Sequence, residues 1–244
     1  MRNARLLRSA IMAPLMVLAV AGGAVAGPFE DAMAAYEADD YATALQLFRP
    51  LAAHGDVKAQ YLLGIIYLRG IGVEQEYAGA LNWLRKAADQ GDAEAQIGLG
   101  FLYDNGVSES SSAVMRERYG IRNAAEAVKW YRRAADQGNF NAQALLGGMY
   151  FGGEGVPQDF VAAHMWYNLA AAHGDISSAV QRERVATLMT PAQVAEAQKL
   201  AREWKPKPEN DKFRAIERTS EAATSPAARA RSGGAGWLDP SHVR

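Results

Sequence analysis

Three arginines recur along the chain and are the residues with the clearest chemistry in this sequence. Arg85 follows Arg49 by 36 residues, and Arg132 follows Arg85 by 47. A guanidinium binds a carboxylate or phosphate-like group through two parallel N–H bonds, so a row of arginines could recognise an anionic partner. Side chains at matching positions extend this predicted partner-binding stripe, which comprises Arg49, Asn82, Arg85, Lys129, Arg132, Met165 and Asn168.

The same arginines also have a purely structural interpretation. Asp89 and Asp136 each follow an arginine by four residues, which is the spacing of neighbours on one helix face. Such ion pairs would keep a helix surface soluble and would recognise nothing. The sequence leaves both interpretations open.

Motifs for catalysis, metal binding or nucleotide binding are absent from the sequence. The four histidines (His54, His164, His173 and His242) form no H-E-x-x-H pair, and there is no G-x-S-x-G, phosphate loop or paired-glycine fingerprint. The serine-rich segment 108–112 has the composition of a loop, with no base nearby. The chain has no cysteine, which excludes disulfides, thiolate metal sites and a lipid-bearing cysteine. We therefore expect no catalytic residues, no cofactor and no metal.

A repeat explains the spacing of the arginines. "RKAADQGDAEAQ" at 85–96 returns as "RRAADQGNFNAQ" at 132–143. Alignment on Gly55, Gly91, Gly138 and Gly174 gives spacings of 36, 47 and 36 residues. A period of 36 with one insertion of 11 residues, near 109–119, is typical of solenoids built from helix pairs.

Each aligned position has a predicted structural role. Good helix N-caps precede the first helix of three repeats (Asp40, Asn123 and Asp159), whereas Glu76 is a poorer one. The aligned glycine should end that helix in a left-handed conformation. The next residue should then cap the second helix; these residues are Asp56, Asp92, Asn139 and Asp175. Three tryptophans share one aligned position (83, 130 and 166), which favours helix packing over sugar stacking.

The sequence resembles the Sel1-like repeat family, a relative of tetratricopeptide repeats. The resemblance depends on the A-x-x-W-x-x-x-A-A-x-x-G pattern, the A-Q-x-x-L-G-x-x-Y stretch and the G-x-G-V turn, and it covers residues 41–204. It implies an all-α fold, a right-handed α-solenoid of stacked helix-turn-helix repeats. In the related tetratricopeptide fold the first helix of each repeat lines the concave face, where the arginine stripe would then lie.

The last repeat departs from the pattern and is followed by a further predicted helix. Thr190, Pro191 and Gln193 form a capping box, and Val194, Ala197, Ala201 and Trp204 lie on one face of the helix that follows. We expect this helix to be a C-terminal cap of the solenoid. Residues 29–38 should form a short helix at the other end.

The two ends of the chain differ in composition from the repeats. Residues 1–26 have three arginines, an apolar run and a final A-x-A, which predicts a secretory signal peptide rather than an uncleaved membrane anchor. Its removal changes the formal charge from −1 to −4, with 23 basic and 27 acidic residues, so we expect no nucleic-acid partner and no stable membrane anchor. Residues 205–244 have few large apolar side chains and are predicted to be a disordered tail.

These observations predict a non-enzymatic scaffold that is periplasmic or secreted and binds another protein through its concave surface. The resemblance implies envelope proteins as partners, because relatives with this repeat are often adaptors or regulators of signalling and export complexes. Direct binding of an anionic polysaccharide along the arginines is the alternative. A β-lactamase-like enzyme is the least favoured function, because the relatives associated with that activity are rich in cysteine.

Overall fold

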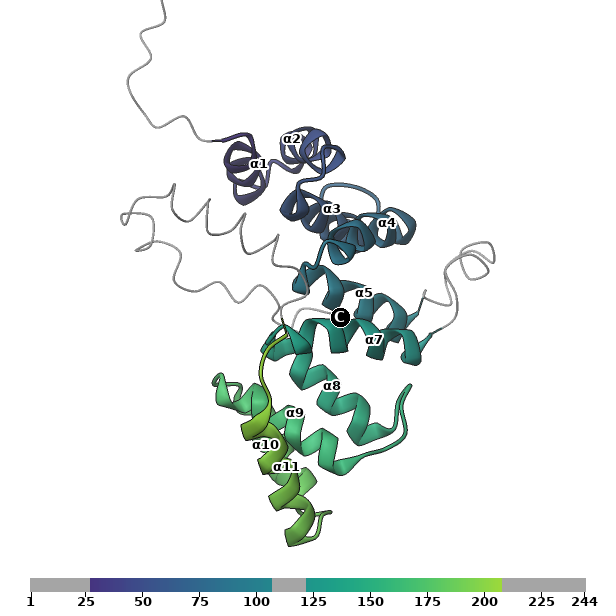
Figure 1. Ribbon diagram of the computed structural model, residues 1–244. Helices are drawn as coiled ribbons and strands as arrows, with labels where there is room; N and C mark the ends of the chain where they lie inside the picture. Colours follow the sequence, from purple (N-terminus) through teal and green to yellow (C-terminus); the bar gives the residue numbers. More distant parts are fainter. Residues whose placement is uncertain (1–26, 107–121, 208–244) are drawn as a thin grey trace, which may run out of the picture.

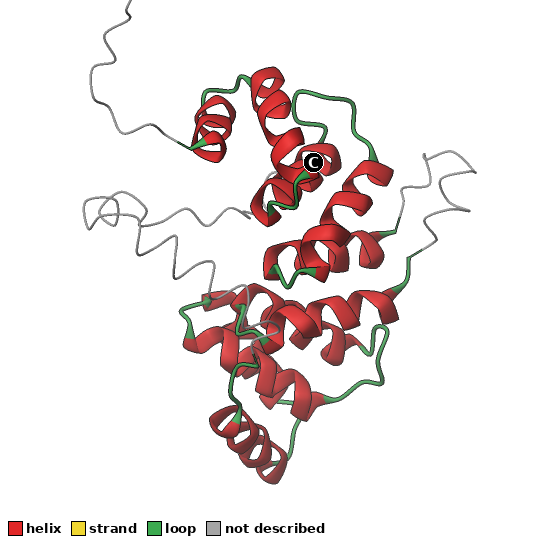
Figure 2. Cartoon of the chain, turned by 45° about the horizontal axis from the view of Figure 1, so that its top comes forward, coloured by secondary structure: helices red, strands yellow, loops and turns green. Residues whose placement is uncertain are grey.

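The computed structural model describes residues 27–106 and 122–207, and all regular structure in these ranges is helical (Figures 1 and 2). The helices are α1 (Pro28–Glu37), α2 (Tyr41–Ala53), α3 (Val57–Arg69), α4 (Tyr77–Asp89), α5 (Ala93–Asn105), α7 (Ala124–Asp136), α8 (Phe140–Gly152), α9 (Phe160–Ala172), α10 (Ile176–Ala186) and α11 (Pro191–Glu203). The predicted all-α fold is confirmed. The predicted signal segment, the insertion at 109–119 and the tail beyond residue 207 lie outside the described residues.

The helices form four consecutive hairpins: α2/α3, α4/α5, α7/α8 and α9/α10. The first helix of each hairpin is called helix A below and the second helix B. Helix B of one repeat packs closely against helix A of the next, as α3 does on α4, α5 on α7 and α8 on α9. The hairpins therefore stack in a row from α1 at one end to α11 at the other (Figure 1). No helix in the described ranges is long and apolar enough to cross a membrane.

The ends of the helices follow the caps predicted from the sequence. Asp40, Asn123 and Asp159 each accept a hydrogen bond from the backbone N–H three residues later, and Glu76 makes no such bond. The predicted caps of helix B behave in the same way, with a side-chain oxygen of Asp56, Asp92, Asn139 or Asp175 bound to the first turn. The aligned glycines have φ between +93° and +97°, which confirms the sharp turn between helices A and B.

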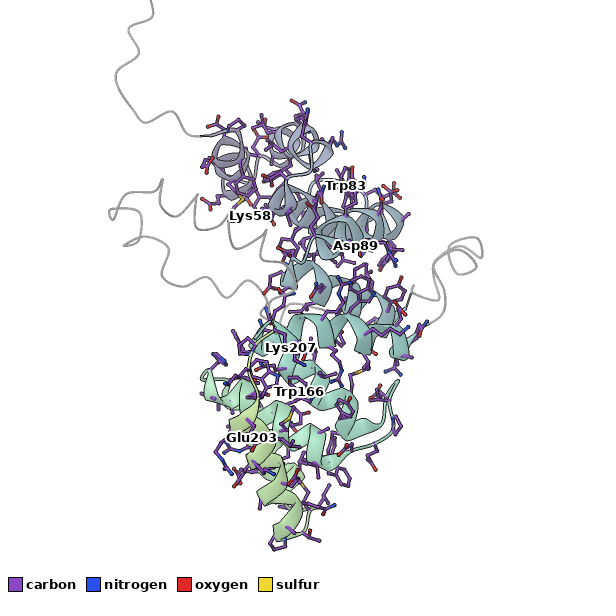
Figure 3. All side chains as sticks on the ribbon, in the orientation of Figure 1. Lys58, Trp83, Asp89, Trp166, Glu203 and Lys207 are labelled. Carbon is purple, nitrogen blue, oxygen red and sulfur yellow. The ribbon has the colours of Figure 1, made fainter. Side chains whose placement is uncertain are left out.

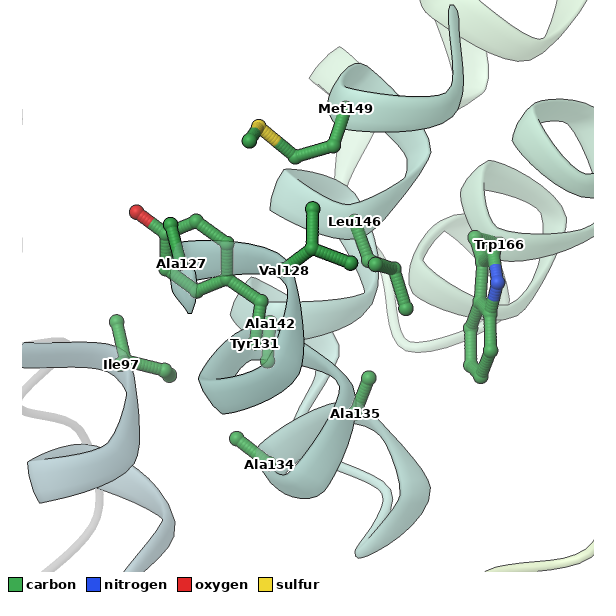
Figure 4. Packing of buried hydrophobic residues seen from close by; sticks show 10 residues of the cluster. All are labelled: Ile97, Ala127, Val128, Tyr131, Ala134, Ala135, Ala142, Leu146, Met149 and Trp166. Atoms are coloured by element: carbon green, nitrogen blue, oxygen red, sulfur yellow. The ribbon is translucent and has the colours of Figure 1, made fainter. Parts of the chain in front are cut away.

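The core depends on close contact between helix B and the next helix A. In α5, a Cβ built on Gly100 would stand 2.3 Å from the ring of Tyr131 on α7, a side chain that is only 1% exposed. Gly64 makes the same approach to Leu84, and Gly147 to Tyr167. Figure 4 shows the resulting cluster, in which Ile97 of α5, Tyr131 of α7 and Leu146 of α8 come together beside Trp166 of α9.

A row of buried glutamines connects the repeats at the ends of helices A. The amide nitrogens of Gln60, Gln96 and Gln143 donate to the carbonyl oxygens eight residues earlier, at distances of 3.0, 3.2 and 3.4 Å. Gln90 of the second repeat donates to Gln60 Oε1 at 2.8 Å, and Gln137 of the third donates to Gln96 Oε1 at 2.9 Å. The amide bonds thus continue from one repeat to the next.

The predicted final helix is present as α11, and both bonds of its capping box are formed between Thr190 and Gln193. Its buried residues are Ala197 and Ala201, and its main packing partner is α9, the last helix A. Two apolar side chains of α10, Ile176 and Val180, remain 80% and 61% exposed. Residues 205–207, the start of the predicted tail, follow α11 in irregular conformation.

Candidate functional site

The three arginines of the predicted stripe occupy the same place on α2, α4 and α7, and each contacts helix B of its own repeat. Arg49 Nη2 donates to the hydroxyl of Tyr67 at 3.2 Å. Arg85 donates in the same way to Tyr103, and Arg132 to Tyr150. In all three pairs the tyrosine follows its arginine by 18 residues, so the pairing of the two aligned positions is part of the repeat.

Two of these arginines also contact the tryptophan of the next repeat. The guanidinium carbon of Arg85 lies 5.8 Å from the ring centre of Trp130, and that of Arg132 lies 5.7 Å from Trp166. Both distances are within the range of cation–π attraction. Each guanidinium therefore lies between a tyrosine of its own helix B and a tryptophan of the following helix A, which orients the cation. Sequence reasoning found both aligned positions but missed that they pair.

The remaining residues of the stripe have individual environments. Asn168, which replaces arginine in the last repeat, accepts a hydrogen bond from Arg182 Nη1 of α10 at 3.0 Å. Lys129 forms an ion pair with Glu126 on its own helix at 2.8 Å. Met165 is half-buried against the cluster around Trp166, and Asn82 is exposed on α4. The predicted residues thus lie at matching positions of α2, α4, α7 and α9, and most of them have a partner within the chain.

Asp89 forms an ion pair with an arginine of the next repeat. Its Oδ1 lies 3.9 Å from Nη1 of Arg133 on α7, and Nη2 of the same arginine donates to the carbonyl of Ala88 at 3.3 Å. The guanidinium of Arg133 also lies 4.4 Å from the ring centre of Trp130. The predicted pairing of Arg85 with Asp89 is therefore replaced by contacts that connect successive helices A.

Each of the three guanidiniums keeps N–H donors to which an anionic group could bind. A guanidinium has five N–H donors, and the bond to tyrosine uses one of them. Arg49 and Arg85 are exposed and Arg132 is half-buried. Because their orientation is fixed in advance, they would lose little side-chain entropy on binding a carboxylate. Within the described ranges, no group of three or more histidine, aspartate or glutamate side chains could hold a metal ion.

An open hollow of about 410 Å³ adjoins Tyr150, the tyrosine that binds Arg132. It lies between the loop before α9 and the first turn of α11, and it is lined by Tyr150, Pro157, Phe160 and Gln193 among others. Its walls are mixed in polarity and contain one ionisable carboxyl, that of Asp159, which already caps α9. The hollow has no arrangement of groups that suggests a ligand.

The comparisons with known proteins agree with the repeat found in the sequence. The family model described as Sel1 repeat matches residues 57–92, 93–139 and 141–175. The chain contains three Sel1 repeats. Helices α1 and α2 precede the matched residues, and α10 and α11 follow them. No curated protein matches the chain.

One solved Sel1-repeat structure shares the fold, and two further solved structures are also similar to this chain. A Sel1 repeat protein from Oxalobacter formigenes is 34% identical with a TM-score of 0.53, over 62% of this chain and 58% of its own length. A protective antigen of uropathogenic Escherichia coli with an SLR fold is 27% identical, with a TM-score of 0.40 over 75% of this chain and 44% of the antigen. Cysteine-rich protein B of Helicobacter pylori is 17% identical, with a TM-score of 0.40 over 64% of this chain and 98% of that protein.

The chain thus spans little more than half of the Oxalobacter protein and less than half of the antigen. Sel1 repeats are in general protein-interaction scaffolds, and their fold is in general non-catalytic. This chain shares their repeats and their all-α fold.

Proposed function

We propose that this chain is an exported, non-enzymatic adaptor that binds an acidic segment of another envelope protein along its helices A. The observation that supports the proposal is the repeated Arg–Tyr contact, extended to the next tryptophan at Arg85 and Arg132. A scaffold that needed its arginines only for solubility would not require Arg85 and Arg132 to be held between two aromatic rings. Regulation of a signalling or export complex is the role that we infer for the adaptor.

Export is the second part of the proposal. It depends on the arginines, apolar run and A-x-A sequence of residues 1–26. Protein recovered from the envelope should begin at Gly27 when its N-terminus is sequenced. Recovery with Met1 or Arg2 in place would contradict cleavage.

The test of binding separates charge from packing. The triple variant R49Q/R85Q/R132Q removes the charges and the tyrosine bonds. The control Y67F/Y103F/Y150F removes the same hydrogen bonds, because phenylalanine lacks the acceptor hydroxyl, but it keeps every charge. Single exposed ion pairs contribute roughly 0–1 kcal/mol, which is why all three arginines are changed together.

We expect the arginine variant to lose its partner in pull-downs from envelope extract, and the tyrosine variant to retain most of it. Equal capture by the two variants would contradict the proposed role of the charges. Direct binding of an anionic polysaccharide is the alternative, and the same arginines would carry it. Captured material that survives protease, together with retention on polygalacturonate beads, would favour that alternative.

A further inference from the structure

The segment that follows α11 lies across helices A of the last two repeats. Residues 204–207 lead from the end of α11, which packs on α9, to the C-terminal end of α7 (Figure 1). Figure 3 shows Glu203, Trp166 and Lys207 in sequence along this path. The segment therefore contacts α7 and α9, two of the helices that carry residues of the arginine stripe.

Three different contacts hold this segment. The ring of Trp204 meets that of Trp166 edge-on, with centres 6.2 Å apart. The ring of Pro206 lies over Gly138, 3.7 Å from the position that a Cβ would occupy there. The backbone N–H of Lys207 donates to the carbonyl oxygen of Asp136 at 2.6 Å. This carbonyl belongs to the last turn of α7, where carbonyls have no partner within the helix.

These contacts have the form of peptide recognition. Trp204 has φ −63° and ψ 140°, the values of a polyproline II segment, and Pro206 keeps the chain extended. Aromatic surfaces that bind such segments combine ring contacts with a main-chain hydrogen bond. The Pro206 ring and the Trp204 ring both lie within 4 Å of the position that a Cβ would occupy at Gly138, an ordinary packing distance. At the equivalent Gly55 and Gly174, no described atom lies within 4 Å of the corresponding position.

We propose that Trp166, Gly138 and the carbonyl of Asp136 form a binding site for an extended protein segment with an aromatic residue and a proline two positions later. In the free chain, residues 204–207 occupy this site, and a partner segment of the same chemistry displaces them. Because the contacts are aromatic, apolar and main-chain, the site is separate from recognition by arginine charge. It is connected to the stripe through Trp166, whose ring also contacts Arg132.

Occupation by the chain itself has a measurable consequence. A tethered segment competes at an effective concentration in the millimolar range, which lowers the apparent affinity for any segment added in solution. Removing the anchor of the tethered segment should restore the intrinsic affinity, because the apparent Kd equals the intrinsic Kd divided by the fraction of open sites. The test therefore measures binding of the chain's own segment when it is supplied separately.

The experiment uses the full-length chain and a fluorescein-labelled peptide of residues 201–207, AREWKPK, with an amidated end. Fluorescence anisotropy at 0.5 M salt, which suppresses charge effects, should show binding to W204A at least tenfold tighter than to the wild-type chain. The same peptide with alanine in place of its tryptophan should not bind W204A. Affinity for W204A no greater than for wild type would overturn the proposal, as would equal binding of the two peptides.

A second variant makes the result independent of any loss of packing in W204A. K207P removes the N–H that donates to Asp136, together with the lysine ammonium group, and keeps the Trp204 contact. We expect it to bind the peptide more tightly than wild type and less tightly than W204A, with an unchanged helical circular dichroism spectrum. Unchanged affinity in K207P would show that the main-chain bond does not hold the segment. It would contradict the proposed role of the Asp136 carbonyl in the site. The peptide test is independent of the proposed function. Whether or not R49Q/R85Q/R132Q loses its partner, the results expected for W204A and K207P are the same.

Discussion

At the scale of single residues, the row of amide bonds between buried glutamines ends at Gln143, because the last repeat has a histidine in place of the donor glutamine. Gln143 is fully buried, and no described group bonds its Oε1, whereas Gln60 and Gln96 each receive a bond from the next repeat. In the second and third repeats the donors are Gln90 and Gln137. The last repeat has His173 at the matching position, where a glutamine would donate to Gln143. An unsatisfied buried acceptor costs about 1–3 kcal/mol.

Replacement of this histidine should therefore stabilise the protein. We expect H173Q to raise the free energy of unfolding by about 1 kcal/mol, because the new amide can donate to Gln143 Oε1. Urea denaturation measures the change. The converse variant Q137A removes the donor to Gln96 and should lower stability by a similar amount. No gain in H173Q, with the expected loss in Q137A, would show that another group already satisfies Gln143.

His164 makes the stability of the last repeat depend on pH. This side chain is 3% exposed and stands where Leu45, Leu81 and Val128 stand in the other repeats. Burial, aided by Arg182, lowers the pKa of His164 below 6.5, although Glu183 opposes the shift. The folded state thus favours the neutral ring. As pH falls below 6.5 the unfolded chain takes up a proton first, and stability is lost progressively until the folded-state pKa is passed.

The variant H164L removes this proton uptake. We expect the free energy of unfolding of wild type to fall relative to H164L between pH 7 and pH 5, with a slope of at most about 1.4 kcal/mol per pH unit. Urea titrations at several pH values measure it, and H54A, which replaces an exposed histidine, is the control. Parallel pH profiles for wild type and H164L would contradict the assignment to His164.

At the scale of helices, the sequence predicts most of what the structure shows, because the signals are local. Each Asp, Asn or Thr N-cap acts on a backbone N–H two or three residues away, and each aligned glycine makes the turn just after its helix A. The candidate site was predicted less completely. The pairing of Arg85 with Tyr103 and Trp130 requires the hairpin and the next repeat to be in place. The bond between Lys207 and Asp136 could not be predicted, because it joins two main-chain groups and residues 205–207 have no apolar pattern.

Two glycines in helices B should respond in opposite ways to the same substitution. In Gly100→Ala the added methyl would stand 2.3 Å from Tyr131, whose ring is buried and cannot move aside. Overpacking of this kind costs about 1–3 kcal/mol, more than the roughly 1 kcal/mol gained in helix propensity. In Gly148→Ala the nearest atom is 3.5 Å away, an ordinary contact, so only the gain should remain.

Thermal melts of the two variants check this expectation. G100A should melt below wild type and G148A above it. If both variants gained stability, helices α5 and α7 would not approach as closely as the repeat requires. Such an outcome would also remove the reason for glycine at the equivalent positions 64 and 147.

For the whole molecule, the stack is held by contacts that repeat from one hairpin to the next. The glutamine amides, the Arg–Trp contacts and the helix B–helix A packing each join neighbouring repeats. An insertion between two repeats should therefore be tolerated, provided that the residues before and after it keep their usual positions. The N–H of Asn123 donates to the carbonyl of Tyr103 at 2.7 Å, as Glu76 does to Tyr67 and Asp159 to Tyr150.

Deletion of residues 109–119 should consequently leave the solenoid intact. Sixteen residues separate Gly106 from Asn123, and the deletion leaves five, the number found between Gly70 and Glu76 and between Gly153 and Asp159. Arg122, which pairs with Asp104 and Glu154, is retained. Shortening the loop from sixteen to five residues reduces its closure entropy, a gain of about 1 kcal/mol for a flexible loop.

We expect the deletion variant to keep its helical circular dichroism and to melt at or slightly above the wild-type temperature. A scrambled sequence of the same eleven residues is the control for composition and should leave both quantities unchanged. If the deletion lowered the melting temperature while the scrambled variant did not, the length of the segment would be needed to join the second and third repeats. The two halves of the stack would then not be in the register that the Asn123–Tyr103 bond defines, and the row formed by Arg85 and Arg132 would be interrupted at that point.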